Sequence, residues 1–134
     1  MNTEAIDFWE RAIESLHTAK ALLSISPDAA ASRAYYAVFY AVSALFAREG
    51  RTFRKHTAVE AAVHLDMVQS GKWKPDLGKA YTRLVRLREV GDYGGGRHVG
   101  QNEASEAVEQ AQRLIEAVRS MCPSDFHQTR NDND

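Results

Sequence analysis

Residues 26–49 read SPDAAASRAYYAVFYAVSALFARE, a pattern typical of a helix that is apolar around most of its circumference. Ser26 can cap the helix with its hydroxyl, and Pro27 has no N–H to lose in the first turn, so the start of the helix is well marked. Gly50 is the expected stop. Because such a helix must be covered by neighbours on nearly all sides, this segment predicts the central helix of a helical protein.

The rest of the chain also shows helical periodicity. Further helices are expected at about Thr3–Ser24, Thr57–Gln69, Asp76–Val90 and Glu103–Met121. Thr57 and Glu60 form the T-x-x-E pattern of a capping box at the start of the third helix. Five glycines between Gly91 and Gly100 predict a loop. Without strand-period alternation or an internal repeat, the sequence predicts an all-α, up-and-down bundle of four to five helices.

A chain of 134 residues is the size of one domain. We expect that domain over residues 1–122, with a disordered polar tail over 123–134. The single Cys122 excludes an intramolecular disulfide and, with it, a disulfide-stapled secreted scaffold. The apolar stretch Ala34–Ala47 is shorter than the ~20 residues that span a bilayer, and the amino terminus has no signal-peptide pattern. We therefore expect a soluble cytoplasmic protein without membrane contact.

Charge is unevenly distributed along the chain, although the formal net charge is only −1. Residues 72–98 carry seven basic and three acidic side chains, whereas residues 99–134 carry three basic and seven acidic ones. The near-neutral total argues against binding of nucleic acid by the whole surface, but it leaves room for a local basic patch.

Familiar catalytic and metal-binding signatures are absent from the sequence. There is no H-E-x-x-H, C-x-x-C, Walker-type glycine loop or G-x-S-x-G. The five histidines have no spacing that supports a metal site, so neither a metal nor a cofactor is expected. The glycines at 94–96 follow a helix rather than a strand, which favours a flexible turn over a phosphate-binding loop.

Arg88 is the informative residue of the helix expected at 76–90. At about 100° per residue it falls on the same arc as the apolar side chains Leu77, Ala80, Tyr81, Leu84 and Leu87. An unpaired buried guanidinium costs several kcal/mol, so Arg88 needs a partner or a cleft. Asp92, four residues on, could pair with it if the helix continues that far. Two interpretations remain: a structural salt bridge or snorkelling side chain, and an arginine held in a groove where it meets phosphate or another subunit.

Two further sets of polar residues are candidates for ligand binding. One stripe of the central helix holds Arg33, Tyr36, Tyr40 and Ser43. Together with Arg88 this stripe predicts a shared polar groove, although tyrosines are more often core residues with a hydrogen-bonded tip. The second set is Lys79, Arg83 and Arg86, which lie away from the apolar arc and could contact a phosphate backbone or form ordinary charged surface.

Three blocks together resemble the small stand-alone HEPN proteins in order and spacing, over roughly Ile6 to Met121. They are SRAYYAVFY at 32–40, Lys55–His56, and RLREVGDYG at 86–94. The resemblance implies a four-to-five-helix bundle that pairs as a homodimer. It also implies a minimal nucleotidyltransferase encoded nearby as partner, because many such proteins are encoded beside one and several pairs act as toxin and antitoxin.

Active HEPN proteins are metal-independent ribonucleases whose motif is an arginine, four to six residues, and a histidine, with two copies building one site. Arg88 is the best match to the motif arginine, but the position five residues on holds Tyr93. A phenol with a pKa near ~10 is a poor substitute for imidazole, so His56 or His98 would have to approach Arg88 in space. In some family pairs the nucleotidyltransferase modifies a tyrosine just past the motif histidine, and Tyr93 matches that place when the motif is counted from Arg86.

The sequence thus supports three hypotheses. The first is a HEPN homodimer that works with a nucleotidyltransferase and binds nucleotide or RNA. The second is a ribonuclease toxin that uses Arg88 with a displaced imidazole, and the third is a helical oligomerisation module without a ligand. The candidate catalytic residues are Arg88, Tyr93 and His56, and the candidate ligand-binding residues are Arg33, Tyr36, Tyr40, Arg88, Asp92, Lys79, Arg83 and Arg86.

Overall fold

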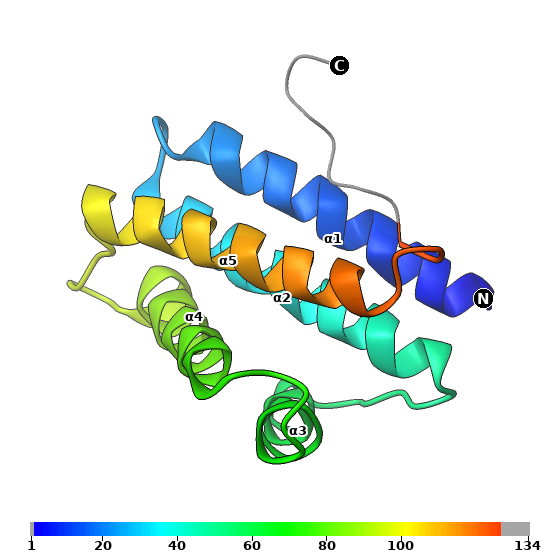
Figure 1. Cartoon of the computed structure of the whole chain (residues 1–134). Coiled ribbons are helices and arrows are strands. Elements are labelled where there is room, and N and C mark those ends of the chain that lie inside the picture. Colours follow the sequence, from blue (N-terminus) through cyan, green and yellow to red (C-terminus); the bar gives the residue numbers. More distant parts are fainter. Residues whose placement is uncertain (1, 127–134) are drawn as a thin grey trace.

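The protein is an all-α bundle, seen in a computed structural model that describes residues 2–126 (Figure 1). The prediction of an all-α fold is confirmed, and the described part contains no strand. Its elements are α1 (Thr3–Leu22), α2 (Pro27–Arg48), α3 (His56–Ala62), the π-helix η1 (Val63–Gln69), α4 (Pro75–Tyr93) and α5 (Gln101–Met121).

Helix α2 is the centre of the bundle, as its apolar circumference predicts. Figure 1 shows α1 and α5 lying alongside it, while α4 and α3 are seen more nearly end-on beneath them. Ser26 caps α2 by accepting a hydrogen bond from the N–H of Ala29 at 3.2 Å, and Pro27 takes the first helical position, both as predicted. Alanines spaced along α2, from Ala30 to Ala47, are almost fully buried, which lets the neighbouring helices approach its backbone closely.

The third helix begins earlier than predicted and changes character midway. Lys55 is its N-cap and makes no side-chain capping bond, so the capping box predicted for Thr57 and Glu60 is wrong. The hydroxyl of Tyr35 lies 2.9 Å from Nδ1 of His56, and this contact with α2 fixes the first residue of α3. From Val63 the helix continues as η1, with the wider π spacing that is rare and often found near functional sites.

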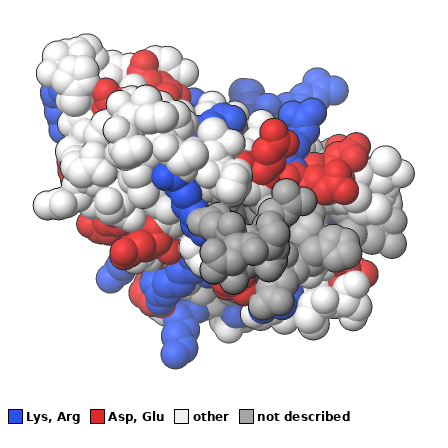
Figure 2. Space-filling model, turned by 90° about the horizontal axis from the view of Figure 1, so that it is seen from above, with Lys and Arg blue, Asp and Glu red and all other residues white. Residues whose placement is uncertain are grey.

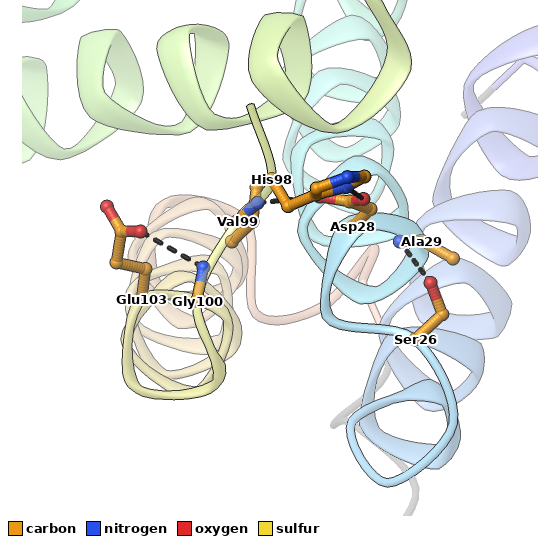
Figure 3. Close-up of polar contacts among 7 residues, drawn as sticks. All are labelled: Ser26, Asp28, Ala29, His98, Val99, Gly100 and Glu103. Atoms are coloured by element: carbon orange, nitrogen blue, oxygen red, sulfur yellow. Dashed lines mark hydrogen bonds and ion pairs between the residues drawn. The ribbon is translucent and has the colours of Figure 1, made fainter. Parts of the chain in front are cut away.

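Helix α4 runs through Tyr93, three residues into the segment predicted to be a loop. The loop that follows is tied to the start of α2 by Asp28 (Figure 3). One carboxylate oxygen of Asp28 accepts the backbone N–H of Val99 at 2.6 Å, and the other lies 2.7 Å from Nδ1 of His98. This clamp fixes the position of the chain between the last turn of α4 and the first turn of α5.

The described chain continues past Cys122 and packs on the bundle at Phe126, within the segment 123–134 for which a disordered tail is predicted. Phe126 is 1% exposed and stacks on Trp9 with ring centroids 4.5 Å apart. Asp125 accepts a hydrogen bond from Nε of Arg48 at 2.6 Å. The remainder of that predicted tail, 127–134, lies outside the described residues.

The described part of the molecule has no helix long and apolar enough to cross a membrane. On the face seen from above, Lys and Arg side chains alternate with Asp and Glu, and neither sign forms a continuous patch (Figure 2). The described residues on this face therefore show no extended surface of one charge in this view.

Candidate functional site

Arg88 is held on the inner side of α4 by aromatic rings. Its side chain is 16% exposed, and its Cζ lies 5.2 Å, 5.6 Å and 5.6 Å from the ring centroids of Tyr35, Tyr36 and Tyr93. Each such cation–π contact contributes about 0.5–2 kcal/mol, depending on how far the pair is removed from water. Three rings thus hold the cation that the helical pattern places on the apolar arc.

The predicted pairing of Arg88 with Asp92 is confirmed, because α4 does extend to that residue. Nε of Arg88 lies 3.4 Å from Oδ2 of Asp92. The geometry is that of an ion pair rather than a hydrogen bond, and this buried Nε has no hydrogen-bond acceptor among residues 2–126. The Nε itself is closed to solvent, so an anion would have to reach the guanidinium through the part of the Arg88 side chain that stays exposed, 16% of its surface.

His56 is the imidazole that approaches Arg88 in space. It contacts the same rings as Arg88: its centroid is 5.8 Å from that of Tyr35 and 5.6 Å from that of Tyr36. Phe39 stacks on its other side at 4.4 Å. Burial, and to a smaller extent the charge of Arg88, lower the pKa of His56, so the ring is neutral at pH 7.

Tyr35 connects His56 to Arg88 and was not among the residues that the sequence singled out. Burial raises its pKa to about 12, so its hydroxyl stays protonated and holds Nδ1 of His56 in place. Its position inside the SRAYYAVFY block is a usable signal, but helical periodicity alone marks Tyr35 as an ordinary core residue. His98, the other histidine considered, is instead bound to Asp28.

Side-chain contacts around Arg88 join five predicted binding residues, which we call the Arg88 cluster: Arg33, Tyr36, Arg88, Asp92 and Tyr93, with His56 and Tyr35 in contact with the same rings. Cζ of Arg33 lies 4.8 Å from the ring centroid of Tyr36, on which Arg88 also rests. Tyr93 is 73% exposed and forms the outer edge. The cluster combines cations with aromatic faces, the two kinds of group that bind nucleotides.

Tyr40 lies to one side of this cluster. Cζ of Arg11 is 5.9 Å from its ring centroid, and both residues line a small cleft between α1 and α2 of about 160 Å³. Arg33 also lines this cleft and so joins it to the Arg88 cluster. Ser43 of the predicted stripe is only 8% exposed and belongs to the core.

Lys79, Arg83 and Arg86 are not part of the Arg88 cluster. They line a separate groove between α4 and η1, together with His64 and Thr82. The candidate binding residues therefore occupy two faces of α4. Among the described residues, no group of three or more His, Cys, Asp or Glu side chains is placed to hold a metal ion.

Comparison with known proteins identifies the family of this chain. The family model of the HEPN domain matches residues 5–121, nearly the whole described bundle. The chain belongs to the HEPN family. A UPF0332 protein of Thermotoga maritima is 36% identical over 118 residues, which cover 87% of this chain and 89% of that protein.

Two further relatives of this HEPN protein extend the comparison. A protein of Methanocaldococcus jannaschii, named as a candidate toxin, is 30% identical over 112 residues, covering 82% of each chain. A crystal structure of a Thermus thermophilus protein superimposes with a TM-score of 0.75, covering 89% of this chain and 98% of that one at 22% identity. At that identity the superposition shows a shared fold.

Proposed function

We propose that this HEPN protein binds a ribonucleotide phosphate, in RNA or in a free nucleotide, at the Arg88 cluster, as the toxin subunit of a toxin–antitoxin pair. The observation that carries the proposal is the guanidinium of Arg88, held against three tyrosine rings on the inner side of α4 with part of its side chain exposed. An arginine presented in this way can bind phosphate, and the neighbouring rings offer faces on which bases stack. The buried free thiol of Cys122 suits a reducing cytoplasm, where we place this function.

The experiment for this proposal is RNA binding with metal ions removed. A labelled single-stranded RNA is titrated with the wild-type protein, with Arg88→Ala and with Arg119→Ala, and fluorescence anisotropy reports the affinity. Arg119 is paired with Glu116 on α5, away from the cluster, so its replacement is the matched loss of one cation. We expect Arg88→Ala to weaken binding at least tenfold relative to Arg119→Ala. Equal affinities of the two variants, with folded circular dichroism spectra, contradict the proposal and favour a module without a ligand.

The proposal includes assembly as a homodimer, as the family resemblance implies. Support comes from the half-buried rings of Tyr36, Phe39 and Tyr40 on α2 and from the exposed ring of Tyr93, which contacts Arg88 on α4. A second copy placed there would cover these rings and bring two Arg88 clusters together. Sedimentation at micromolar concentration is expected to give twice the chain mass of 15.0 kDa. A monomer at that concentration contradicts a composite site.

The proposal also includes a nucleotidyltransferase partner that modifies Tyr93. Support comes from the exposure of this tyrosine and from its contact with Arg88. In such a step the phenol oxygen attacks the α-phosphorus of a nucleoside triphosphate, its proton is lost, and pyrophosphate leaves. With a minimal nucleotidyltransferase and ATP, we expect the mass of one adenylyl group on Tyr93, and no gain in Tyr93→Phe. An unmodified wild-type chain, with an enzyme that is active on another substrate, contradicts this partnership.

A second candidate function is metal-independent cleavage of RNA, favoured by the position of His56 behind Arg88. In the tautomer whose Nδ1–H donates to the Tyr35 oxygen, Nε2 of the neutral imidazole can remove the proton of a ribose 2′-hydroxyl, while the guanidinium neutralises charge that develops on the phosphate. Cleavage in the presence of EDTA that both His56→Ala and Arg88→Ala abolish would support this activity. RNA that stays intact at all protein concentrations would leave binding as the function of the cluster.

A further inference from the structure

A second cationic surface lies on the outer face of α4, away from the Arg88 cluster. Lys79, Arg83 and Arg86 line an open groove of about 470 Å³. Their spacing of four and three residues places them about 6 Å and 4.5 Å apart along the helix axis. A row of cations at such intervals can follow a chain of phosphates rather than a single anion.

The opposite wall of the groove is η1, which packs directly on α4. A Cβ on Gly78 would lie 2.8 Å from Cγ2 of Val68 and 3.2 Å from Nδ1 of His64, so a larger residue would push the two helices apart. Nε2 of His64 lies 3.0 Å from the hydroxyl oxygen of Thr82, which ties the two walls together. The groove is therefore determined by the packing of η1 on α4, which needs the small Gly78 and is stabilised by the contact between His64 and Thr82.

The charge of the groove is largely uncompensated. Arg83 has one partner at the rim, where Nη2 lies 3.3 Å from Oε2 of Glu103. Within residues 2–126, neither Lys79 nor Arg86 lies within ion-pair distance of a carboxylate. In the described part of the chain, no Tyr, Trp or Phe lines the groove. A surface with cations but no aromatic rings can bind the phosphate backbone, but it does not recognise the bases.

We propose that the α4–η1 groove binds the phosphate backbone of an RNA strand without regard to its sequence. The choice of RNA as the polyanion rests on the function proposed for the Arg88 cluster, whereas the groove's affinity for phosphates rests on its own residues. The two surfaces share α4 but face different ways, so the groove adds affinity for an extended strand and contributes nothing to a single nucleotide.

The test compares a long and a short ligand. A labelled oligouridylate and uridine monophosphate are each titrated with wild type, the double variant Lys79→Ala/Arg86→Ala, Arg88→Ala and the control Arg119→Ala. We expect the double variant to bind the oligouridylate at least tenfold more weakly at low salt and to bind the monophosphate normally. The plot of log affinity against log salt should become less steep by about 1.4, because the double variant loses two phosphate contacts and each contributes about 0.7 for a single strand.

A gain-of-affinity variant provides the converse test. Glu103→Gln removes the carboxylate that neutralises Arg83, and glutamine can still accept the N–H of Gly100 that Glu103 binds at 3.0 Å. We expect the oligouridylate to bind about two- to fivefold more tightly, with a steeper salt slope.

The outcomes separate the two proposals. If the double variant and Arg119→Ala bind the oligouridylate with equal affinity, the proposal that the groove binds RNA is wrong. It is also wrong if the double variant loses as much affinity for the monophosphate as for the oligouridylate. If the double variant loses affinity while Arg88→Ala binds the monophosphate normally, the groove is supported and the function proposed for the Arg88 cluster fails.

Discussion

Arg88 and His56 approach the same tyrosine rings from different elements, α4 and the first residue of α3. Both side chains contact the rings of Tyr35 and Tyr36, and the charge of Arg88 helps to lower the pKa of His56. Packing on aromatic faces positions both side chains, together with the Asp92 ion pair of Arg88 and the Tyr35 hydrogen bond of His56. The partly exposed guanidinium of Arg88 beside these rings is the physical basis of the proposed function.

The carboxyl of Asp28 contributes to stability through its charge. Its hydrogen bond with His98, reinforced by the N–H of Val99, lowers the pKa of its carboxyl. A lowered folded-state pKa means that the stabilisation is present above pH ~4 and is lost as the pH falls through the folded-state pKa. We expect Asp28→Asn to lower the free energy of unfolding by about 1 kcal/mol at pH 7. Urea denaturation of wild type and Asp28→Asn measures this difference in the free energy of unfolding.

The pH dependence is the internal control for that prediction. Below the folded-state pKa the wild-type carboxyl is also uncharged, so the stability difference between wild type and Asp28→Asn should shrink towards pH 3. A difference that is the same at pH 7 and pH 3 would show that the Asp28 clamp does not act through its charge.

Helix ends account for most of the differences between the predicted and observed elements. The sequence predicted the position of α2 closely because capping chemistry at Ser26 and Pro27 is local. The end of α4 and the start of α3 depend on contacts with α2, made by Gly91 and His56, which no local pattern contains. The same reason explains η1, whose π spacing has no counterpart in the apolar periodicity of residues 63–69.

Gly91 offers a test of how closely α4 and α2 approach. A Cβ at this position would lie 2.7 Å from the backbone oxygen of Asp28, which belongs to the first turn of α2 and cannot rotate away. We expect Gly91→Ala to lower the free energy of unfolding by about 1–3 kcal/mol, the usual cost of overpacking. The matched control is Gly96→Ala, where a Cβ meets nothing within 4 Å and the change should be near zero. Equal chemical denaturation midpoints for the two variants would refute the close approach.

Closure of the bundle at its carboxyl end depends on Phe126. Its ring lies against Trp9 near the start of α1 and so joins the two ends of the described chain. We expect Phe126→Ala to lower the free energy of unfolding by roughly 3 kcal/mol, whereas Phe126→Leu should retain more than half of that contribution. Thermal and urea unfolding followed by circular dichroism measure both. A wild-type-like Phe126→Ala would show that residues 123–126 do not contribute to the core.

For the whole molecule, the sequence predicted the fold class and the separation of Arg88 from Lys79 and Arg86 on α4, but not the contacts that join different elements. Helical periodicity placed Arg88 on the inner arc and Lys79, Arg83 and Arg86 on the outer one, and the structure keeps them apart in that way. Periodicity could not show that Tyr35 links Arg88 to His56, because that contact joins α2, α3 and α4. Helical periodicity also could not show that a groove forms between α4 and η1, because one wall of that groove comes from a different element.

The most direct test of the central claim is the titration of His56 by NMR, with and without uridine monophosphate. In the free protein we expect its pKa to lie below the usual value of about 6.5, and to rise in Arg88→Gln as the neighbouring charge is removed. A phosphate bound at Arg88 brings negative charge beside the imidazole, so saturating nucleotide should raise the pKa of His56 in wild type and leave it unchanged in Arg88→Gln. A wild-type pKa that does not move with nucleotide would contradict the assignment of the Arg88 cluster as the binding site.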